Sequence, residues 1–205
     1  MEKFDLKNTL PDYFKASPSK FSVVKLPKFN YLMVDGKGDP NTSPSYMEAI
    51  ELLYGTSYTL KFMSKDELGR DYVVPPLEGL WWAKEMKGFE KREKSKWSWT
   101  MMIMVPNGIT KAYATKAIKN FKEKKPEANI SKIRFDSLTE GLSVQILHVG
   151  PYDAEGPVLA RMHKEFMPKN NFGFNGMHHE IYLGDPRKTA PERLKTILRQ
   201  SVTKN

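Results

Sequence analysis

Two stretches of the chain constrain the fold most strongly, because each joins a strand to a helix in the same way. The first reads YLMVDG and leads to Ser43-Pro44, which opens a helical segment. The second reads VQILHVG and leads to Gly156-Pro157, which opens another. Apolar, strand-like segments follow both. The sequence therefore predicts a strand–helix–strand–strand unit that occurs twice, giving two similar layers with a seam between them.

Prolines, glycines and apolar spacing place the elements of the first half. FSVVKLP and FNYLMVDGKG are predicted as two strands, broken at Pro27. A helix is expected with Ser43 as its N-cap and Pro44 as its first residue. VVPPLEGLWWAK and WSWTMMIMVP are expected to form an antiparallel pair of strands, joined by a long charged loop that reaches residue 96.

The second half alternates in the same way. A helix is predicted from about Thr110 to Lys124, ended by Pro126, and a short strand over IRFDSL. LSVQILHVG and HHEIYLGDP read as strands on either side of a helix over EGPVLARMHKEFM. The closing segment PERLKTILRQSV has the apolar spacing of a helix, whereas the repeat predicts a strand there. The first 20 residues, with Pro11 and Pro18, are expected to be an extended lead-in.

Composition limits the class of protein. The chain has 205 residues, of which 40% are apolar and 12% aromatic, which are the values of a globular protein. It has no cysteine, so disulfides, thiolate metal sites and a cysteine nucleophile are excluded. The N-terminus lacks the apolar core of a signal peptide, and the run WSWTMMIMV is too short to span a bilayer. We therefore expect a cytoplasmic protein with no membrane partner.

The charge is strongly basic but mixed. The net charge is +9, from 33 basic and 24 acidic residues, and the excess lies in residues 84–96 and 116–127. Acidic residues alternate with the lysines in both segments, and the chain contains no zinc-finger or aromatic-basic RNA motif. Solvated lysine-rich loops and helix faces are thus favoured over nucleic acid as a partner. The oligomeric state is left open.

Four tryptophans lie between positions 81 and 99. In the second strand of the expected pair, Trp97 and Trp99 share a face, and in the first Trp82 shares a face with Glu78. Core packing is the ordinary role of such an aromatic stripe. Two tryptophans on one face of a strand are equally compatible with a pocket for a flat ligand.

Other kinds of site lack their motifs. Of the four histidines, His178 and His179 are adjacent and point to opposite faces of a strand, and no H-E-x-x-H spacing occurs. We therefore expect no metal. The chain has no G-x-S-x-G nucleophile elbow and no glycine-rich phosphate loop, so no cofactor is expected either.

The strand HHEIYLGDP carries a glutamate in its middle. His178, Glu180 and Tyr182 share one face, because alternate side chains of a strand point the same way. If that face meets water, Glu180 is satisfied by a surface lysine or by His178. If the face lines an aromatic cavity, Glu180 attracts a cationic or electron-poor ligand or acts as a general base.

A resemblance to a known family favours the second reading. HVGPYDAEGPVLARMHKEF, HHEIYLGDPRK and PERLKTILRQSV, in this order, resemble the ligand-binding domain of the GyrI-like family. PLEGLWW and WSWTMMIMVP are similar to a branch of stand-alone proteins in that family. The match covers roughly residues 20 to 203.

The resemblance implies an α+β fold of two βαββ modules related by a pseudo-twofold, an antiparallel sheet with helices, and a ligand pocket at the seam. It also implies that the closing segment is a strand. We therefore expect a lead-in over residues 1–20 and a single domain over 21–205, made of repeats at about 21–105 and 142–203 joined by a helical connection.

The resemblance also implies a choice of functions. Family members include effector domains of helix-turn-helix regulators, in which a pocket glutamate attracts lipophilic cations, and gyrase inhibitors. The stand-alone branch is implicated in hydrolysing cyclopropanoid DNA-alkylating compounds, a form of xenobiotic detoxification. The chain has only about 20 residues before its first strand, too few for a helix-turn-helix reader, which disfavours transcriptional control by this chain alone.

We hypothesise that Glu180 is the general base of such a hydrolase, with Tyr113, in preference to Tyr152, orienting the water or the ligand carbonyl. The alternative is a multidrug-type binder of lipophilic or cationic aromatic molecules without turnover. In both cases the expected ligand is a hydrophobic or aromatic small molecule, and the expected ligand-binding residues are Trp82, Trp97, Trp99, Tyr152, Met162, His178 and Tyr182.

Overall fold

The computed structural model describes residues 3–83 and 93–204. Six strands and the helices between them make an α+β fold, as the resemblance implies. The chain divides into two compact units. Unit 1 is Met1–Thr9, Phe29–Pro75 and Trp81–Leu138, and unit 2 is Leu10–Lys28, Pro76–Leu80 and Thr139–Asn205.

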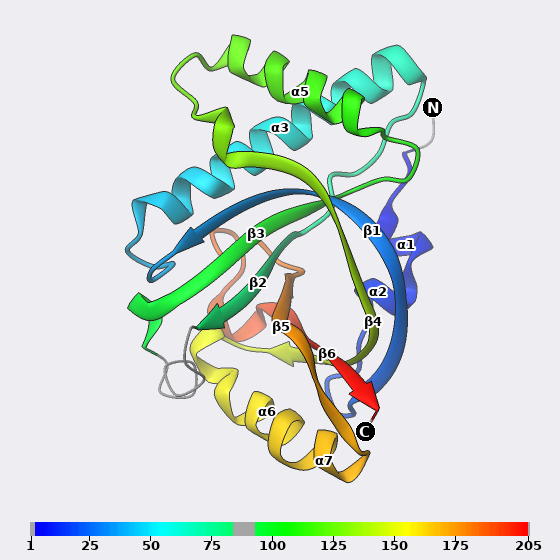
Figure 1. Ribbon diagram of the computed structural model, residues 1–205, viewed down its shortest axis with the longest axis vertical. Helices are drawn as coiled ribbons and strands as arrows, with labels where there is room; N and C mark the ends of the chain where they lie inside the picture. Colours follow the sequence, from blue (N-terminus) through cyan, green and yellow to red (C-terminus); the bar gives the residue numbers. More distant parts are fainter. Residues whose placement is uncertain (1–2, 84–92, 205) are drawn as a thin grey trace. The chain divides into compact units, whose positions relative to one another are not determined.

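Unit 1 is two helices packed on antiparallel strands. Strand β1 (Ser22–Lys37) pairs with β3 (Trp97–Val105) from Asn30 opposite Val105 to Lys37 opposite Ser98. Helices α3 (Pro44–Leu68) and α5 (Lys111–Lys124) run side by side, and α3 contacts β3 (Figure 1). The core of unit 1 lies between these helices and strands.

Local chemistry explains where the two helices begin and how closely they pack. Pro44 is at the start of α3, and Gly69 ends the helix in the left-handed conformation at φ 63°. The hydroxyl of Thr110 accepts a hydrogen bond from the backbone N–H of Tyr113 at 3.2 Å and so caps α5. A side chain at Gly55 would collide with the ring of Phe121, so glycine there lets the helices approach. Both helices were predicted from the sequence.

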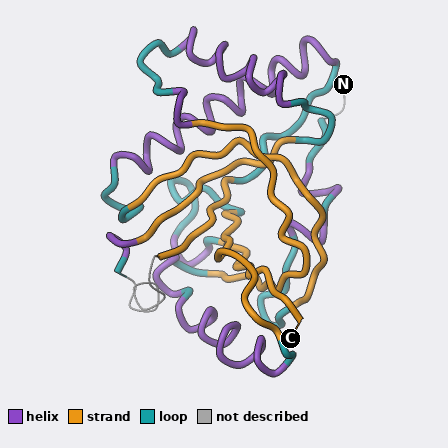
Figure 2. Tube along the Cα trace, in the orientation of Figure 1, coloured by secondary structure: helices purple, strands orange, loops and turns teal. Residues whose placement is uncertain are grey.

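Unit 2 is built around its last strand. Strand β6 (Lys195–Lys204) pairs antiparallel with both β4 (Ile133–Val149) and β5 (Phe172–Tyr182). A helical segment covers one face of these strands (Figure 2). It consists of α6 (Gly156–Arg161), a π-helical turn η4 (Met162–Phe166) and α7 (Met167–Lys169).

The remaining elements are short. They are α1 (Leu6–Thr9), α2 (Pro11–Phe14), β2 (Leu77–Ala83) and the 3-10 turns η1 (Lys94–Lys96), η2 (Ile130–Lys132), η3 (Tyr152–Ala154) and η5 (Pro191–Arg193). The order strand–helix–strand–strand occurs twice, as β1–α3–β2–β3 and as β4–α6/α7–β5–β6. The pseudo-twofold between these halves stays a prediction.

The structure corrects several expected boundaries. The lead-in is not extended, because Pro11 opens the short helix α2, which buries Tyr13 and Phe14. Pro27 does not break the first strand, since its fixed φ suits extended backbone. IRFDSL and LSVQILHVG form one strand, β4, and the helix after it is interrupted by the π-helical turn.

The closing segment is the strand β6, as the resemblance implies and against its helical spacing. Pairing on both of its edges outweighs local periodicity there. Most of the expected loop between β2 and β3 lies outside the described residues. No helix in residues 3–83 and 93–204 is long and apolar enough to cross a membrane.

The contact between Gly36 and Trp99 gives a direct test of packing in unit 1. These residues face each other on β1 and β3, and a Cβ at Gly36 would lie 2.1 Å from the buried indole. Gly36→Ala is expected to lower the free energy of unfolding by about 1–3 kcal/mol, because the ring cannot move without disturbing the core. Urea denaturation measures the change.

Gly184→Ala is the matched control, since the nearest atom to a Cβ there is at 3.5 Å, an ordinary contact distance. It is expected to change the free energy of unfolding by less than about 0.5 kcal/mol. Equal shifts in the two variants would contradict the close packing of Gly36 on Trp99.

Candidate functional site

The residues predicted from the sequence divide between the two units. Unit 1 contains Trp82, Trp97, Trp99 and Tyr113. Unit 2 contains Tyr152, Met162, His178, Glu180 and Tyr182.

In unit 2 the strand pairing assembles one face around Glu180. His178, Glu180 and Tyr182 alternate along β5, so they point to the same side of the sheet. Residues paired across neighbouring strands also share a side. The face therefore has three rows across β5, β6 and β4: Tyr182–Thr196–His148, Glu180–Leu198–Ile146 and His178–Gln200–Val144.

The carboxylate of Glu180 accepts a hydrogen bond from Tyr182 and lies beside the ring of His178, each of them two residues away on the strand. The Tyr182 hydroxyl donates a hydrogen bond of 2.7 Å to Oε2 of Glu180. The Nε2 atom of His178 lies 3.3 Å from Oε1, and the Glu180 side chain is only 12% exposed. The predicted shared face of His178, Glu180 and Tyr182 is confirmed. Of the two partners predicted to satisfy a non-functional Glu180, a surface lysine and His178, it is His178 that lies close to the carboxylate.

The helical segment covers the same face. Met162 and Met167 pack against an apolar core formed by Val144, Ile146, Leu198 and Val202. The ring of Tyr152 stands edge-on to that of Tyr182, with centroids 5.5 Å apart. Unit 2 thus gathers the five predicted residues that belong to it on β5, in the 3-10 turn of Tyr152 and in the helical segment.

His163 is a neighbour of this group that sequence reasoning did not select. Its ring lies 6.4 Å from that of His178 and 5.0 Å from that of Phe174. Burial, and then the proximity of His178 and Lys164, lowers the pKa of His163 to about 4, so its imidazole is neutral at pH 7. His163 lies in the π-helical turn, a conformation frequent at functional sites, and a regular helical pattern does not reveal such a turn.

The opposite face of β5 carries a buried ionic cluster. His179 is fully buried, with Nδ1 2.9 Å from Glu140 Oε1 and Nε2 2.9 Å from Glu78 Oε2. The Nη1 group of Arg199 donates a 3.0 Å hydrogen bond to the other oxygen of Glu140. We call this group, completed by Tyr13 and Gln145, the His179 cluster.

Tyr13 and Gln145 satisfy the remaining groups of the cluster. The hydroxyl of Tyr13 donates to Glu78 Oε2 at 2.5 Å, and the backbone carbonyl of Tyr13 accepts from Arg199 Nη2 at 2.6 Å. The side-chain oxygen of Gln145 accepts from Nε and Nη2 of Arg199 at 3.0 and 2.8 Å. The guanidinium also lies 4.2 Å from the centre of the Tyr13 ring, a cation–π contact.

Mutual pairing keeps the central members of the cluster ionised. Burial alone would lower the pKa of His179, but Glu140 and Glu78 outweigh it and raise that pKa to about 9. Burial alone would raise the pKa of Glu140, but His179 and Arg199 lower it to about 2. At neutral pH, His179 is therefore a cation that Glu140 and Glu78 share.

In unit 1 the aromatic residues form a separate cluster. The Trp99 ring is fully buried and stands edge-on to Tyr46 at 5.3 Å between centroids. Tyr46 also contacts Trp81 at 6.2 Å, and Trp81 contacts Trp97 at 5.7 Å. Trp81, which was not selected from the sequence, thus joins Trp97 and Trp99. Trp82 is half-buried and, as the next residue on the strand, points to the other side.

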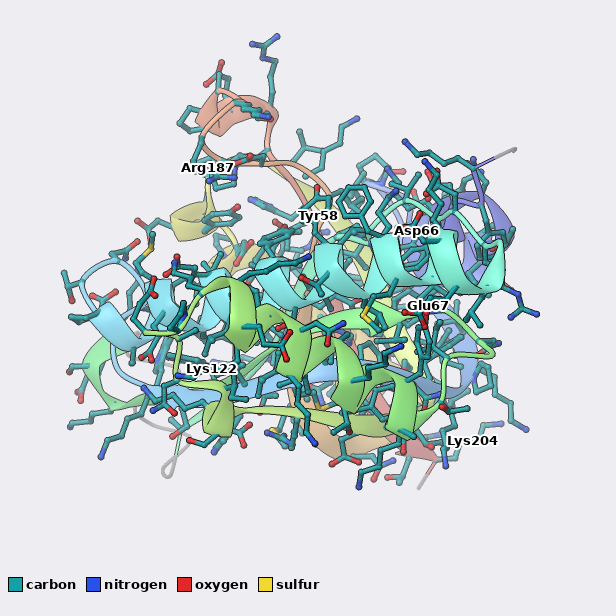
Figure 3. All side chains as sticks on the ribbon, turned by 90° about the horizontal axis from the view of Figure 1, so that it is seen from above. Tyr58, Asp66, Glu67, Lys122, Arg187 and Lys204 are labelled. Atoms are coloured by element: carbon teal, nitrogen blue, oxygen red, sulfur yellow. The ribbon has the colours of Figure 1, made fainter. Side chains whose placement is uncertain are left out.

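Tyr113 lies in the first turn of α5, beside the C-terminal end of α3. Asp66 and Glu67 are on that end of α3 (Figure 3). Burial raises the pKa of Tyr113, and the neighbouring carboxylate of Glu67 raises it further. Glu67 is itself ion-paired with Lys116 at 2.8 Å, and the catalytic role of Tyr113 stays a prediction. In the described part of the chain, no group of three or more histidine and carboxylate side chains is arranged to hold a metal.

The sequence of the chain matches that of the GyrI-like small molecule binding domain over residues 19–199. The protein belongs to this family. Among curated proteins, none matches the chain.

Solved structures support the assignment. A conserved, uncharacterised protein of Listeria innocua is 36% identical, with a TM-score of 0.90 over 98% of this chain and 100% of its own. Two structures of proteins from the same organism, each described as a hydrolase, are also 36% identical over 98% of this chain and 100% of theirs, with TM-scores of 0.84 and 0.88. The C-terminal domain of EcmrR, 13% identical with a TM-score of 0.57 over 91% of this chain and 98% of its own, shares the fold.

The shared cation of the cluster predicts a loss of stability at alkaline pH. Folding raises the pKa of His179 from 6.5 to about 9. The contribution of protonated His179 to the free energy of unfolding is therefore complete below pH 6.5 and is lost as the pH rises through 9. The loss is on the order of 3 kcal/mol. Urea unfolding from about pH 6 to pH 10 measures it, and subtraction of a His179→Gln series removes the contribution of other groups. Parallel curves for the two proteins would contradict the raised pKa.

Proposed function

We propose that this GyrI-like domain binds a hydrophobic aromatic small molecule against Glu180 and hydrolyses it, with a cyclopropanoid DNA-alkylating compound as the substrate class. One observation carries the proposal: a largely buried carboxylate, oriented by Tyr182 and flanked by His178, on a face that also presents Tyr152. The description of two 36% identical relatives as hydrolases supports the reaction class. The role is xenobiotic detoxification.

The reaction needs one base and a positioned water. Glu180 takes a proton from the water while the oxygen of that water bonds to a cyclopropane carbon of the substrate. The strained carbon–carbon bond breaks, and its electron pair moves into the conjugated carbonyl, whose oxygen is then protonated. The product is the substrate plus one water. Ring strain lowers the barrier, so general base catalysis, worth typically about 10²–10⁴-fold, is a sufficient contribution from the protein.

Other residues have supporting roles in this proposal. The hydrogen bond from Tyr182 fixes one oxygen of Glu180 and leaves further lone pairs on the carboxylate for water. Tyr152, whose ring stands edge-on to that of Tyr182, offers aromatic contact for a flat ligand, and Met162, which is buried in the adjoining core, remains a hypothetical ligand contact. Trp82, Trp97 and Trp99 as ligand contacts, and Tyr113 as a group that orients the ligand carbonyl, remain part of the hypothesis.

A non-catalytic binder of lipophilic or cationic aromatic molecules is the second candidate. The observation that favours it is that both oxygens of Glu180 already have a close neighbour, Tyr182 or His178. Glu180 would then act as a fixed anion that attracts a cation in a poorly solvated site.

Glu180→Gln separates the two functions. With a duocarmycin-type cyclopropanoid, wild-type protein is expected to form a product that has gained one water. The variant is expected to bind the same compound but convert it at least about 100-fold more slowly, because it lacks the base. Mass spectrometry measures the conversion, and equilibrium dialysis measures binding.

Glu192→Gln is the matched control, because it makes the same change of charge at an exposed position of unit 2 and is expected to keep wild-type turnover. If wild-type protein binds the cyclopropanoid without converting it, and Glu180→Gln weakens binding of an aromatic cation but not of a neutral analogue, the protein is a binder. Equal turnover by wild type and Glu180→Gln would exclude Glu180 as the base.

A further inference from the structure

The register of β5 is not fixed by an apolar pattern alone. The strand has polar side chains on both faces, with His178 and Glu180 on one and His179 on the other. A bulge precedes them, since the pairing with β6 shifts between Phe174 and His178, and Gly176 adopts φ 109°. A slip of one residue beyond the bulge would exchange the faces of His179 and Glu180.

We propose that the His179 cluster holds β5 in the register that presents Glu180, which makes His179 a positioning residue for the site on the opposite face of the strand. The proposal rests on the proposed function only in taking Glu180 as the working carboxylate. The register itself is a property that can be measured without turnover.

The contacts of His179 account for this role. His179 lies opposite Arg199 on β6, and Arg199 lies opposite Gln145 on β4, so one row of the sheet leads directly into the cluster. Both ring nitrogens of His179 are used, one by Glu140 and the other by Glu78. Two carboxylates on opposite sides of one ring require donors at both nitrogens, which only the imidazolium supplies.

Slippage in either direction is electrostatically unfavourable. In one direction Glu180 would take the position of His179 and bring a third carboxylate between Glu78 and Glu140. In the other direction Glu180 would take the position of Ile181, which is fully buried opposite the equally buried Ile197. An unpaired carboxylate is costly in both places, so the observed register is strongly preferred.

The charge balance of the cluster predicts which substitution should destabilise the register of β5 and which second substitution should stabilise it again. The cluster pairs Glu78 and Glu140 with His179 and Arg199. His179→Gln removes one cation and leaves a buried negative charge in excess. Glu78 is the carboxylate most dependent on His179, because its second oxygen, Oε1, has no hydrogen-bond partner among the described residues. His179→Gln combined with Glu78→Gln therefore restores neutrality.

The experiment compares wild type, His179→Gln, the double variant and Glu180→Gln by NMR. The first signal is amide hydrogen exchange along β5, which is expected to be roughly tenfold or more faster in His179→Gln and to return toward the wild-type rate in the double variant. The second is the ring resonance of Tyr182, which reports its hydrogen bond to Glu180. In His179→Gln the Tyr182 resonance is expected to shift toward the chemical shift that it has in Glu180→Gln. In the double variant it is expected to return to its wild-type chemical shift.

Arg187→Gln is the control, since its ion pair with Asp185 is exposed in the same unit, and it is expected to change neither signal. Unchanged Tyr182 resonances and β5 exchange in His179→Gln would overturn the proposal. If His179→Gln does not fold, the double variant decides: a native Tyr182 resonance supports the positioning role, and failure to fold or to restore the resonance overturns it. A wild-type protein that shows these signals but converts no cyclopropanoid would refute the proposed function and leave the positioning role standing.

Discussion

The sharing of one buried imidazolium by two carboxylates is the interaction on which unit 2 depends. The ring nitrogens of His179 donate to Glu78 on one side and to Glu140 on the other, and Arg199 balances the second negative charge. These groups come from β2, β4, β5 and β6, with Tyr13 of α2 as a fifth contributor. Burying four charged groups is costly, and the dense set of hydrogen bonds among them offsets that cost. The cluster therefore favours one arrangement of these elements over its alternatives.

The same strand connects this cluster to the candidate site. Because successive side chains of β5 point to opposite faces, the residue after His179 necessarily faces the helical segment, and that residue is Glu180. The apolar core lies on the Glu180 side, and the Glu180 side chain is only 12% exposed. The π-helical turn then places His163 beside His178 on that side. A structural ionic network and a candidate reactive carboxylate thus occupy the two sides of one strand.

Part of this arrangement could be predicted from the sequence. The shared face of His178, Glu180 and Tyr182 follows from the period of two that every strand has, so it needed only the correct assignment of a strand. The His179 cluster could not be predicted, because Glu78, Glu140 and Arg199 are far apart in the chain and meet only through the pairing of strands. For β6, local spacing indicated a helix, whereas the internal repeat predicted, and the family resemblance implied, the strand that is observed. The aromatic cluster of unit 1 contains Trp81, which was not selected from the sequence; Trp82, the next residue on the strand, faces the opposite way, and its role as a ligand contact stays a prediction.

The most direct measurement of the central claim, that Glu180 is the group that acts on a bound small molecule, is a crystal structure of the protein with the ring-opened cyclopropanoid bound. We expect the newly added hydroxyl of the product to lie within hydrogen-bonding distance of the Glu180 carboxylate, with the hydrogen bond from Tyr182 to Glu180 retained. A product bound away from β5, with no contact to Glu180, would contradict the claim.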